Sequence, residues 1–431
     1  MSTKELLHKL FYIPRSIAGP GNRKTIKILS SYCGNKIKLR SFKSNEKFGN
    51  WIVPKEWIVK KAQVLDKKKR KIVDFNRNNL ELVVNSVSFK GLISKKSFLK
   101  KIFTLKKNIR AIPYITSYYK KNFWGVCMKY ADVKKLKDKK YFVEIETVKK
   151  NGKMNYGEYF IKGKNKKEII FSSYICHPQM ANNELSGPVV LSGLINEIKK
   201  YLGNKKPNFS YRFLFLPETI GSIAYIHKNI SNLKKNVFSG YIITCVGTKK
   251  KFKLVLSPNE NTVADNIAKQ ALNKIAHNNW ETRSFLERGS DERQWCSPKV
   301  NLPFCSICRS KYGEYKEYHT SLDNLDFIDL KGLKESLKLY LEIFKTFENS
   351  NFYLSRSIGE PKLDIYGLYP KISTLGTRKK IKNLMNIIAY CDGEKNEYDI
   401  AQRLNLKIPY VKKVLNNLKR KEILINNFKN E

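Results

Sequence analysis

The sequence lacks the features of several classes of protein. No window approaches the roughly 18 uninterrupted apolar residues of a membrane helix, and the N-terminus has no apolar segment followed by a small-residue cleavage site. The eight cysteines are scattered through apolar segments without disulfide-like spacing, which favours a reducing compartment. The single CxxC pair, Cys305 and Cys308, has no partner pair and fits a buried strand better than a zinc or redox site. We therefore expect a cytoplasmic protein without membrane contact.

Acidic residues are few compared with basic ones. The chain has 84 Lys and Arg against 37 Asp and Glu, a formal net charge of +47. Such an excess is typical of proteins that bind nucleic acid or membranes. Here most of it is Lys accompanied throughout by Asn and Ile, as an AT-biased genome produces at surface positions. We interpret the charge as a solvated surface rather than a dedicated polyanion site, and nucleic acid is not an expected partner.

Strand-like and helical segments alternate between about residues 114 and 350. The length of 431 residues and the hydrophobic content of 42% suffice for about three folded domains. This alternation predicts an α/β domain with a mostly parallel sheet and helices on both faces. The expected strands include 141–148, 168–175, 211–216, 238–246 and 304–307, and the expected helices follow residues 187, 261 and 329.

Two further modules flank or interrupt this pattern. Short β-like segments separated by turns indicate an inserted β-rich domain at 41–113, so that the α/β domain comprises 1–40 and 114–350. A linker with Pro361, Gly367, Pro370 and Gly376 leads to three helices and a short apolar strand. This last part predicts a winged helix at 365–431.

Polar residues that could carry chemistry follow the predicted strands. Only five histidines occur, and His177 comes directly after the apolar strand that starts at Glu168. Glu218 follows the next apolar strand, and His319 lies in a polar loop before the final long helix. Ligands of open α/β sheets bind at the carboxyl ends of the strands. Two imidazoles, a Glu and a further oxygen ligand such as Asn183 would form a zinc shell with room for water.

Several motifs along the chain occur together in one family. They lie at 14–19 and 22–25, 51–57, 112–119, 176–178, 185–187, 217–222, 288–294 and 309–323. With them the chain resembles bacterial aminopeptidase-like proteins, often encoded among surface-polysaccharide genes and related to zinc exopeptidases and glutaminyl cyclases. The resemblance implies a zinc exopeptidase-like α/β domain, an inserted β module and a C-terminal winged helix.

The resemblance also implies residue roles. His177 corresponds to the first His ligand of the zinc exopeptidases, and His319 to the last. Asn183 falls where these enzymes place the Asp that bridges two metals. Glu218 matches one of two adjacent glutamates in these enzymes, of which one is the general base and the other a metal ligand. Asp291 resembles an active-site Asp that does not itself bind the metal but lies behind the ligands.

The chain departs from the family pattern at three positions. Asn183 offers a neutral amide in place of the bridging carboxylate, and Pro217 replaces one of the two adjacent glutamates. Thr244 stands where the exopeptidases have another Asp ligand. A dinuclear centre would lack the carboxylates that balance two dications, so we expect one zinc ion rather than two.

These observations favour a zinc-dependent aminopeptidase-like hydrolase that acts on a peptide or amide-linked small substrate, in surface-polysaccharide biosynthesis. Glu218 and Asp291 are the expected catalytic residues, and His177, Asn183, Glu218 and His319 the expected zinc ligands. Two alternatives stay open: a catalytically altered metal-binding or scaffolding protein, and a DNA-binding protein that uses the Lys-rich last helix of the winged domain. The sequence leaves the oligomeric state open, with a homo-oligomer as one option.

Overall fold

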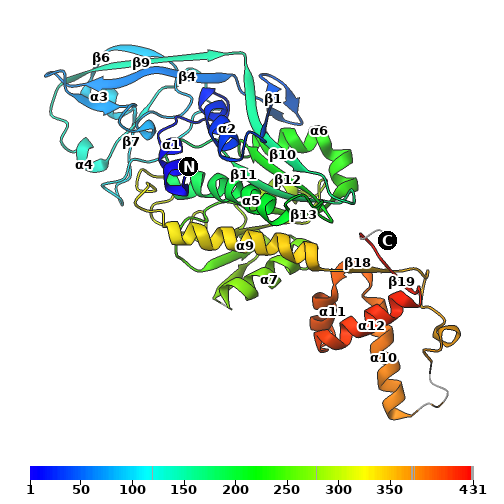
Figure 1. Ribbon diagram of the computed structural model, residues 1–431. Helices are drawn as coiled ribbons and strands as arrows, with labels where there is room; N and C mark the ends of the chain where they lie inside the picture. The colour runs from blue at the N-terminus through cyan, green and yellow to red at the C-terminus, as the bar shows by residue number, and fades with distance from the viewer. Residues whose placement is uncertain (119, 278, 370–371, 373, 429–431) are drawn as a thin grey trace.

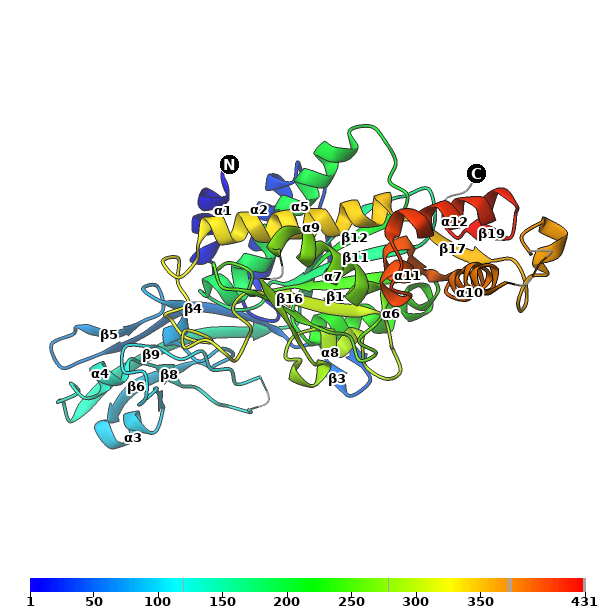
Figure 2. The same cartoon turned by 90° about the horizontal axis from the view of Figure 1, so that it is seen from below.

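The computed structural model describes residues 1–118, 120–277, 279–369, 372 and 374–428 (Figure 1). Tyr119 and Pro370, used above in a motif and in the linker, lie outside these ranges, as do the last three residues of the predicted winged helix. Figure 2 shows the β module and the winged helix at opposite ends of the central α/β domain. Among the described residues, no helix combines the length and apolarity needed to cross a bilayer.

The central sheet has eight strands, and its four inner strands β12, β11, β13 and β16 run parallel. In spatial order the strands are β1 (Lys38–Lys43), β10 (Lys153–Ile161), β12 (Ser210–Leu216), β11 (Glu168–Tyr174), β13 (Val237–Ile243), β16 (Phe304–Cys308), β14 (Phe252–Val255) and β15 (Trp280–Arg283). All residues of β11, β13 and β16 are buried, which explains their continuous apolar sequences. The predicted α/β class with a mostly parallel sheet is confirmed, and Cys305 and Cys308 lie in a buried strand as expected.

Helices cover both faces of this sheet. One face packs against α1 (Thr3–Phe11), α2 (Pro20–Tyr32), α5 (Ser186–Leu202), α7 (Val263–Ala276) and α9 (Leu330–Asn349). The other face packs against α6 (Ile220–Asn236) and α8 (Glu292–Trp295). Because the inner strands are parallel, their carboxyl ends meet at one edge of the sheet, where the loops to these helices begin.

The inserted β module is built on a four-stranded antiparallel sheet. Its strands, in spatial order, are β5 (Lys71–Asp74), β4 (Glu56–Leu65), β9 (Lys140–Lys150) and β6 (Phe89–Ser94). Smaller elements complete it: η1 (Asn79–Glu81), α3 (Lys95–Leu99), β7 (Ile102–Phe103), β8 (Val126–Cys127) and α4 (Tyr130–Val133). The short hairpin of β2 (Lys47–Phe48) and β3 (Trp51–Ile52) instead contacts α6.

The module boundaries differ from the predicted 41–113. Strand β9, expected in the α/β domain, pairs with β4 and β6 of the module. Strand β1, which the predicted boundary at 41 divides, pairs along its whole length with β10 of the central sheet. Pairing partners decide these memberships, and the order of strands along the chain does not reveal them.

The C-terminal domain is a winged helix, as predicted, but it begins earlier than residue 365. Its three-stranded sheet has the order β18 (Asp392–Asn396), β17 (Phe352–Ser355) and β19 (Leu424–Asn426). The remaining elements are η4 (Leu363–Tyr366), α10 (Leu375–Ala389), α11 (Glu397–Arg403) and α12 (Ile408–Arg420). Because β17 precedes the linker and has only four residues, the sequence pattern gave no sign that it is the central strand.

Candidate active site

The predicted site residues gather at the carboxyl edge of the central sheet. His177 follows β11, Glu218 follows β12, Thr244 follows β13, and the loop with His319 comes after β16. His177 and Glu218 line a cavity of about 370 Å³. Its wall also includes Trp51, Tyr118 and Arg293, so the β2–β3 hairpin and the β module contribute to it.

His177 and Glu218 face each other across the cavity floor. The His177 Nε2 and Glu218 Oε2 atoms are 3.5 Å apart. Ser290 Oγ donates a hydrogen bond to Glu218 Oε1 at 3.3 Å, and the Glu218 backbone N–H donates to Cys176 Sγ. Burial raises the pKa of Glu218, so this carboxylate holds a proton more readily than an exposed one.

The other side of the His177 ring contacts a buried ion pair. His177 Nδ1 is 3.0 Å from Glu184 Oε2, and Glu184 Oε1 is 3.1 Å from Arg15 Nε, with both of these side chains fully buried. Arg15 also donates to the backbone oxygens of His177 and Leu10. Glu184 therefore fixes the ring and leaves Nε2 directed at Glu218, an arrangement also typical of metal-binding histidines.

Cys176, His177 and Glu184 form a cluster whose possible ligand atoms lie within 4.8 Å of one another. We do not assign a metal to it. Burial raises the pKa of Cys176 to about 11, and its Sγ lies 3.6 Å from His177 Nδ1. The charge of Glu184 is already matched by Arg15.

His319 lies beside His177 on its own loop, although it is not among the residues that line the cavity. Its backbone is left-handed, with φ of 54°, and its carbonyl accepts a hydrogen bond from the Tyr114 N–H at 2.8 Å. The Tyr114 ring packs edge-on against both histidines, whose own ring centroids are 5.6 Å apart. Burial lowers the pKa of His319 to about 3, so the ring is neutral. Its Nε2 is buried without a hydrogen-bond partner among the described residues.

Asn183 lies on a π-helical turn, η2 (Ala181–Leu185), at the start of α5. The Asp323 carboxylate accepts hydrogen bonds from the backbone N–H groups of residues 181–183 and fixes this turn. Asn183 Nδ2 donates to the Tyr174 hydroxyl at 2.8 Å. Asn183 Oδ1 is buried and has no hydrogen-bond partner in the described part of the chain.

The Thr244 hydroxyl is engaged in hydrogen bonds with its neighbours. It is 2.6 Å from the Tyr174 hydroxyl and donates to the Asn183 carbonyl oxygen at 3.2 Å. The hydroxyl thus serves to hold the Asn183 turn.

Asp291 lies beneath the turn that carries Glu218. One of its oxygens accepts the Thr219 N–H at 2.8 Å and the other accepts the Ser222 hydroxyl at 2.7 Å. Thr219 has φ of 63°, a strained conformation for a β-branched residue. The predicted catalytic residue Asp291 is thus engaged by this turn and is not among the residues that line the cavity.

The predicted donors have ligand types that zinc accepts, although among the described residues the ligand atoms of His177, Glu218 and His319 do not all lie within 4.8 Å of one another. Zinc accepts all the ligand types of this set, which consists of two imidazoles, one amide oxygen and one carboxylate. Two of these donors, His319 Nε2 and Asn183 Oδ1, are buried polar atoms for which the described residues offer no partner, which is costly unless a ligand satisfies them. Thr244 and Glu184 are engaged with other partners, Thr244 with Tyr174 and the Asn183 carbonyl and Glu184 with Arg15.

The sequence did not reveal every residue of this site. Arg15 and Tyr114 belong to quoted motifs, but nothing in the sequence showed that Arg15 is buried against Glu184. Asp323 stands four residues after His319, and its capping of the Asn183 turn depends on a loop contact that only the fold creates.

Comparison with known proteins places this site in context. A protein of Clostridium acetobutylicum named as a polysaccharide biosynthesis protein with an aminopeptidase-like domain is 36% identical over 422 residues, which are 97% of this chain and 95% of that protein. A crystal structure from the same species, of a protein named as a peptidase, matches with a TM-score of 0.80 and 35% identity over 98% of this chain and 95% of that one.

More distant structures share the fold. The zinc aminopeptidase of Bacillus subtilis matches with a TM-score of 0.58 and 13% identity over 79% of this chain and 94% of its own. A winged helix-turn-helix family matches residues 351–426, and the family described as a domain of unknown function, DUF4910, matches residues 4–350. The chain therefore belongs to the DUF4910 family, with an aminopeptidase-like α/β domain followed by a winged helix.

Proposed function

We propose that the chain is a zinc-dependent hydrolase that cleaves a peptide or amide bond of a small substrate in polysaccharide biosynthesis. One observation carries the proposal: in the described part of the chain His319 Nε2 is buried without a hydrogen-bond partner, and its ring packs against His177, which faces Glu218. Asn183 Oδ1, on the side chain that donates to Tyr174, is likewise buried without a described partner. The name of the relative from Clostridium acetobutylicum supports the pathway.

In the proposed reaction each of these residues has a separate role. His177, His319 and Asn183 would hold the ion, which when bound polarises a carbonyl oxygen and acidifies water. Glu218 would accept the proton of the attacking water and pass it to the leaving nitrogen. A single carboxylate bound tightly to the ion would lose this basicity, so we assign Glu218 the role of base. Asp291 and Ser290 hold its carboxylate and its turn in place.

The cavity wall favours an amide-linked substrate that carries an anionic group. A free peptide amine would need a carboxylate to bind it, and Glu218 is the only carboxylate among the described lining residues. Arg293 offers a guanidinium group there, a good partner for a substrate carboxylate or phosphate. The rings of Trp51 and Tyr118 add flat apolar surface.

Metal analysis tests the proposal. Protein purified without chelator should contain about one zinc per chain, and His319→Ala should remove it. His227→Ala is the matched control, because His227 is an exposed histidine on α6 that does not line the cavity. Zinc-free native protein, or equal zinc loss in both variants, would contradict the proposed centre.

Activity against a library of N-acylated amino sugars and aminoacyl amides then tests the base. Glu218→Gln should retain the zinc and lose at least about 100-fold in kcat, as expected for removal of a general base. Unchanged turnover in this variant would exclude Glu218 from the chemistry.

A further inference from the structure

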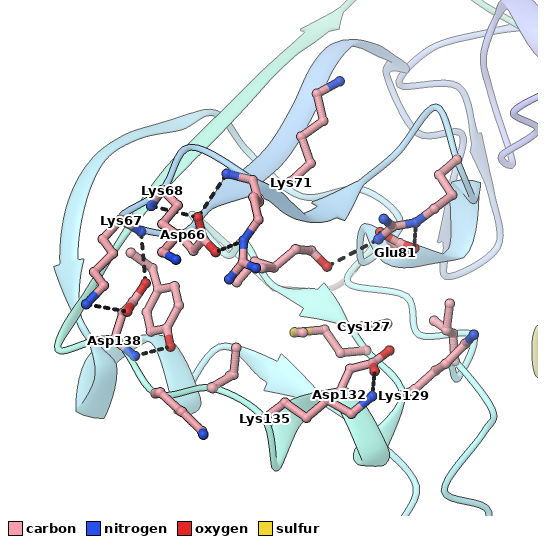
Figure 3. Close-up of a pocket in the computed structure, with 18 residues that line it drawn as sticks. Asp66, Lys67, Lys68, Lys71, Glu81, Cys127, Lys129, Asp132, Lys135 and Asp138 are labelled. Atoms are coloured by element: carbon pink, nitrogen blue, oxygen red, sulfur yellow. Dashed lines mark hydrogen bonds and ion pairs between the residues drawn. The ribbon is translucent and has the colours of Figure 1, made fainter.

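The inserted β module has a cavity of its own, distinct from the strand-end site. Its volume is about 640 Å³, and none of its lining residues belongs to the cavity of His177 and Glu218. It lies between the turn that joins β4 to β5 and the segment that runs from β8 through α4 to β9 (Figure 3). Its size is in the range of small-molecule sites.

Basic side chains dominate the lining of this cavity. Eight are cationic and four are carboxylates, an excess of four positive charges. Figure 3 shows Lys67 and Lys68 beside Asp66 at one side of the cavity and Lys129 at the other. The cationic residues are Lys67, Lys68, Arg70, Lys71, Arg77, Lys129, Lys135 and Lys137.

Three of the carboxylates are used to build the walls. Asp66 accepts the backbone N–H groups of Lys68 and Arg70, both at 2.9 Å, and the Arg70 Nε at 2.7 Å. Asp138 accepts the Lys67 N–H at 2.8 Å. Glu81 is buried and makes two 2.8 Å bonds with Arg77. These bonds fix the β4–β5 turn and tie it to the segment before β9.

Three lysines remain without a carboxylate partner. Lys68, Lys129 and Lys137 form no ion pair with any described residue. They come from two separate segments: Lys68 stands on the turn that Asp66 fixes, and Lys129 and Lys137 stand on the segment between β8 and β9. Gathering like charges around a hollow raises the electrostatic free energy unless an anion enters.

The floor of the cavity is apolar. It includes the buried side chains of Cys127, Met128, Leu136 and Tyr141. The Tyr141 hydroxyl accepts the Asp138 N–H at 3.0 Å, so the position of its ring is fixed. An organic group would find a preformed surface there.

We propose that this cavity binds a small organic diphosphate. The phosphates would lie among Lys68, Lys129, Lys137 and the outer nitrogens of Arg70, and the organic group on the apolar floor. An excess of four charges spread over several lysines suits a multiply charged group, because each lysine acts as a point charge. A lone carboxylate would neutralise only a quarter of that excess.

Calorimetric titration of the full-length protein with uridine diphosphate tests this site. We expect one saturable site per chain, and Kd should rise at least tenfold in the Lys68→Glu/Lys129→Glu variant. Inorganic pyrophosphate should bind to the same site more weakly than uridine diphosphate, because it cannot use the floor. The milder Lys68→Gln/Lys129→Gln variant should show a smaller rise in Kd. Because it removes the two charges without reversing them, it tests the site even if the charge-reversed variant misfolds.

The matched control is Lys96→Glu/Lys100→Glu, which reverses two exposed lysines of the same module outside the cavity. It should bind uridine diphosphate as the natural protein does. Absence of saturable binding, or an equal loss in the control, would overturn the proposal in favour of a nonspecific basic surface. Pyrophosphate binding as tight as that of the nucleotide would also overturn it, because the floor would then have no role.

Discussion

At the scale of single residues, the site depends on a chain of buried charged groups. Arg15 and Glu184 are fully buried and paired, and Glu184 in turn holds His177. Burying two charges is costly, and their attraction compensates only while both are present. The pair therefore links the orientation of a catalytic-site histidine to the stability of the whole domain.

Glu184→Gln should destabilise the protein by about 3–5 kcal/mol, because it leaves the Arg15 charge buried without a counter-charge. Urea denaturation followed by circular dichroism measures this difference. Glu146→Gln is the control, since Glu146 pairs with Lys60 at the surface with both side chains more than half exposed, and such pairs contribute at most about 1 kcal/mol. Equal unfolding midpoints for the two variants would show that the buried pair does not stabilise the fold.

The predictability of each residue followed from its place in the sequence. The placement of His177 and Glu218 at one edge of the sheet could be predicted, because each comes directly after an apolar strand and strand ends of a parallel sheet converge. His319 was found from its polar loop before a long helix. The burial of Arg15 could not be predicted, because the local sequence around a buried arginine does not differ from that around an exposed one. Its partner Glu184 also lies 169 positions away along the chain.

At the scale of elements, the start of α5 packs unusually close to the sheet. A Cβ on Gly187 would lie 2.2 Å from the Ile243 carbonyl oxygen and 2.3 Å from Ser173 Oγ. This contact brings the turn with Asn183 against the ends of β11 and β13. Only a glycine allows it, which gives the Leu-Ser-Gly motif a steric reason.

Gly187→Ala should therefore push α5 away from the sheet and cost about 1–3 kcal/mol, as overpacking does. Gly376→Ala is the matched control, because nothing lies within 4 Å of its added Cβ and its position in α10 is helical. There alanine should leave stability unchanged or raise it by up to about 1 kcal/mol. Thermal unfolding of both variants measures the contrast, and similar losses would disprove the steric explanation.

Element types were easier to predict than their partners. The helices after residues 187, 261 and 329 and the inner strands were expected from periodicity and are present. Strand β9 was expected in the wrong sheet, because the turn between β9 and β10 leads from the sheet of the β module into the central sheet. Long-range pairing leaves no local trace in composition.

At the scale of the whole molecule, aromatic side chains join the winged helix to the α/β domain. Phe352 of β17 packs against Phe238 and Phe209, with ring centroids 5.1 and 5.9 Å apart, and Phe428 joins the same cluster. The last helix is also engaged within its own domain, because Lys412 lies 3.7 Å from Glu397. These contacts favour a packed module over a freely presented DNA-reading helix.

The aromatic cluster predicts that the two domains unfold together. Phe352→Ala removes a side chain that is 1% exposed and should cost about 3–5 kcal/mol. Combined with Phe428→Ala, which removes the other ring that the C-terminal domain places against Phe209 and Phe238, it should also divide a single calorimetric transition into two, with polar contacts such as the bond from Gln270 to Asp399 remaining. Leu375→Ala, in the same domain but 89% exposed, should leave the transition intact. Two separate transitions already in the natural protein would show that the cluster does not couple the domains.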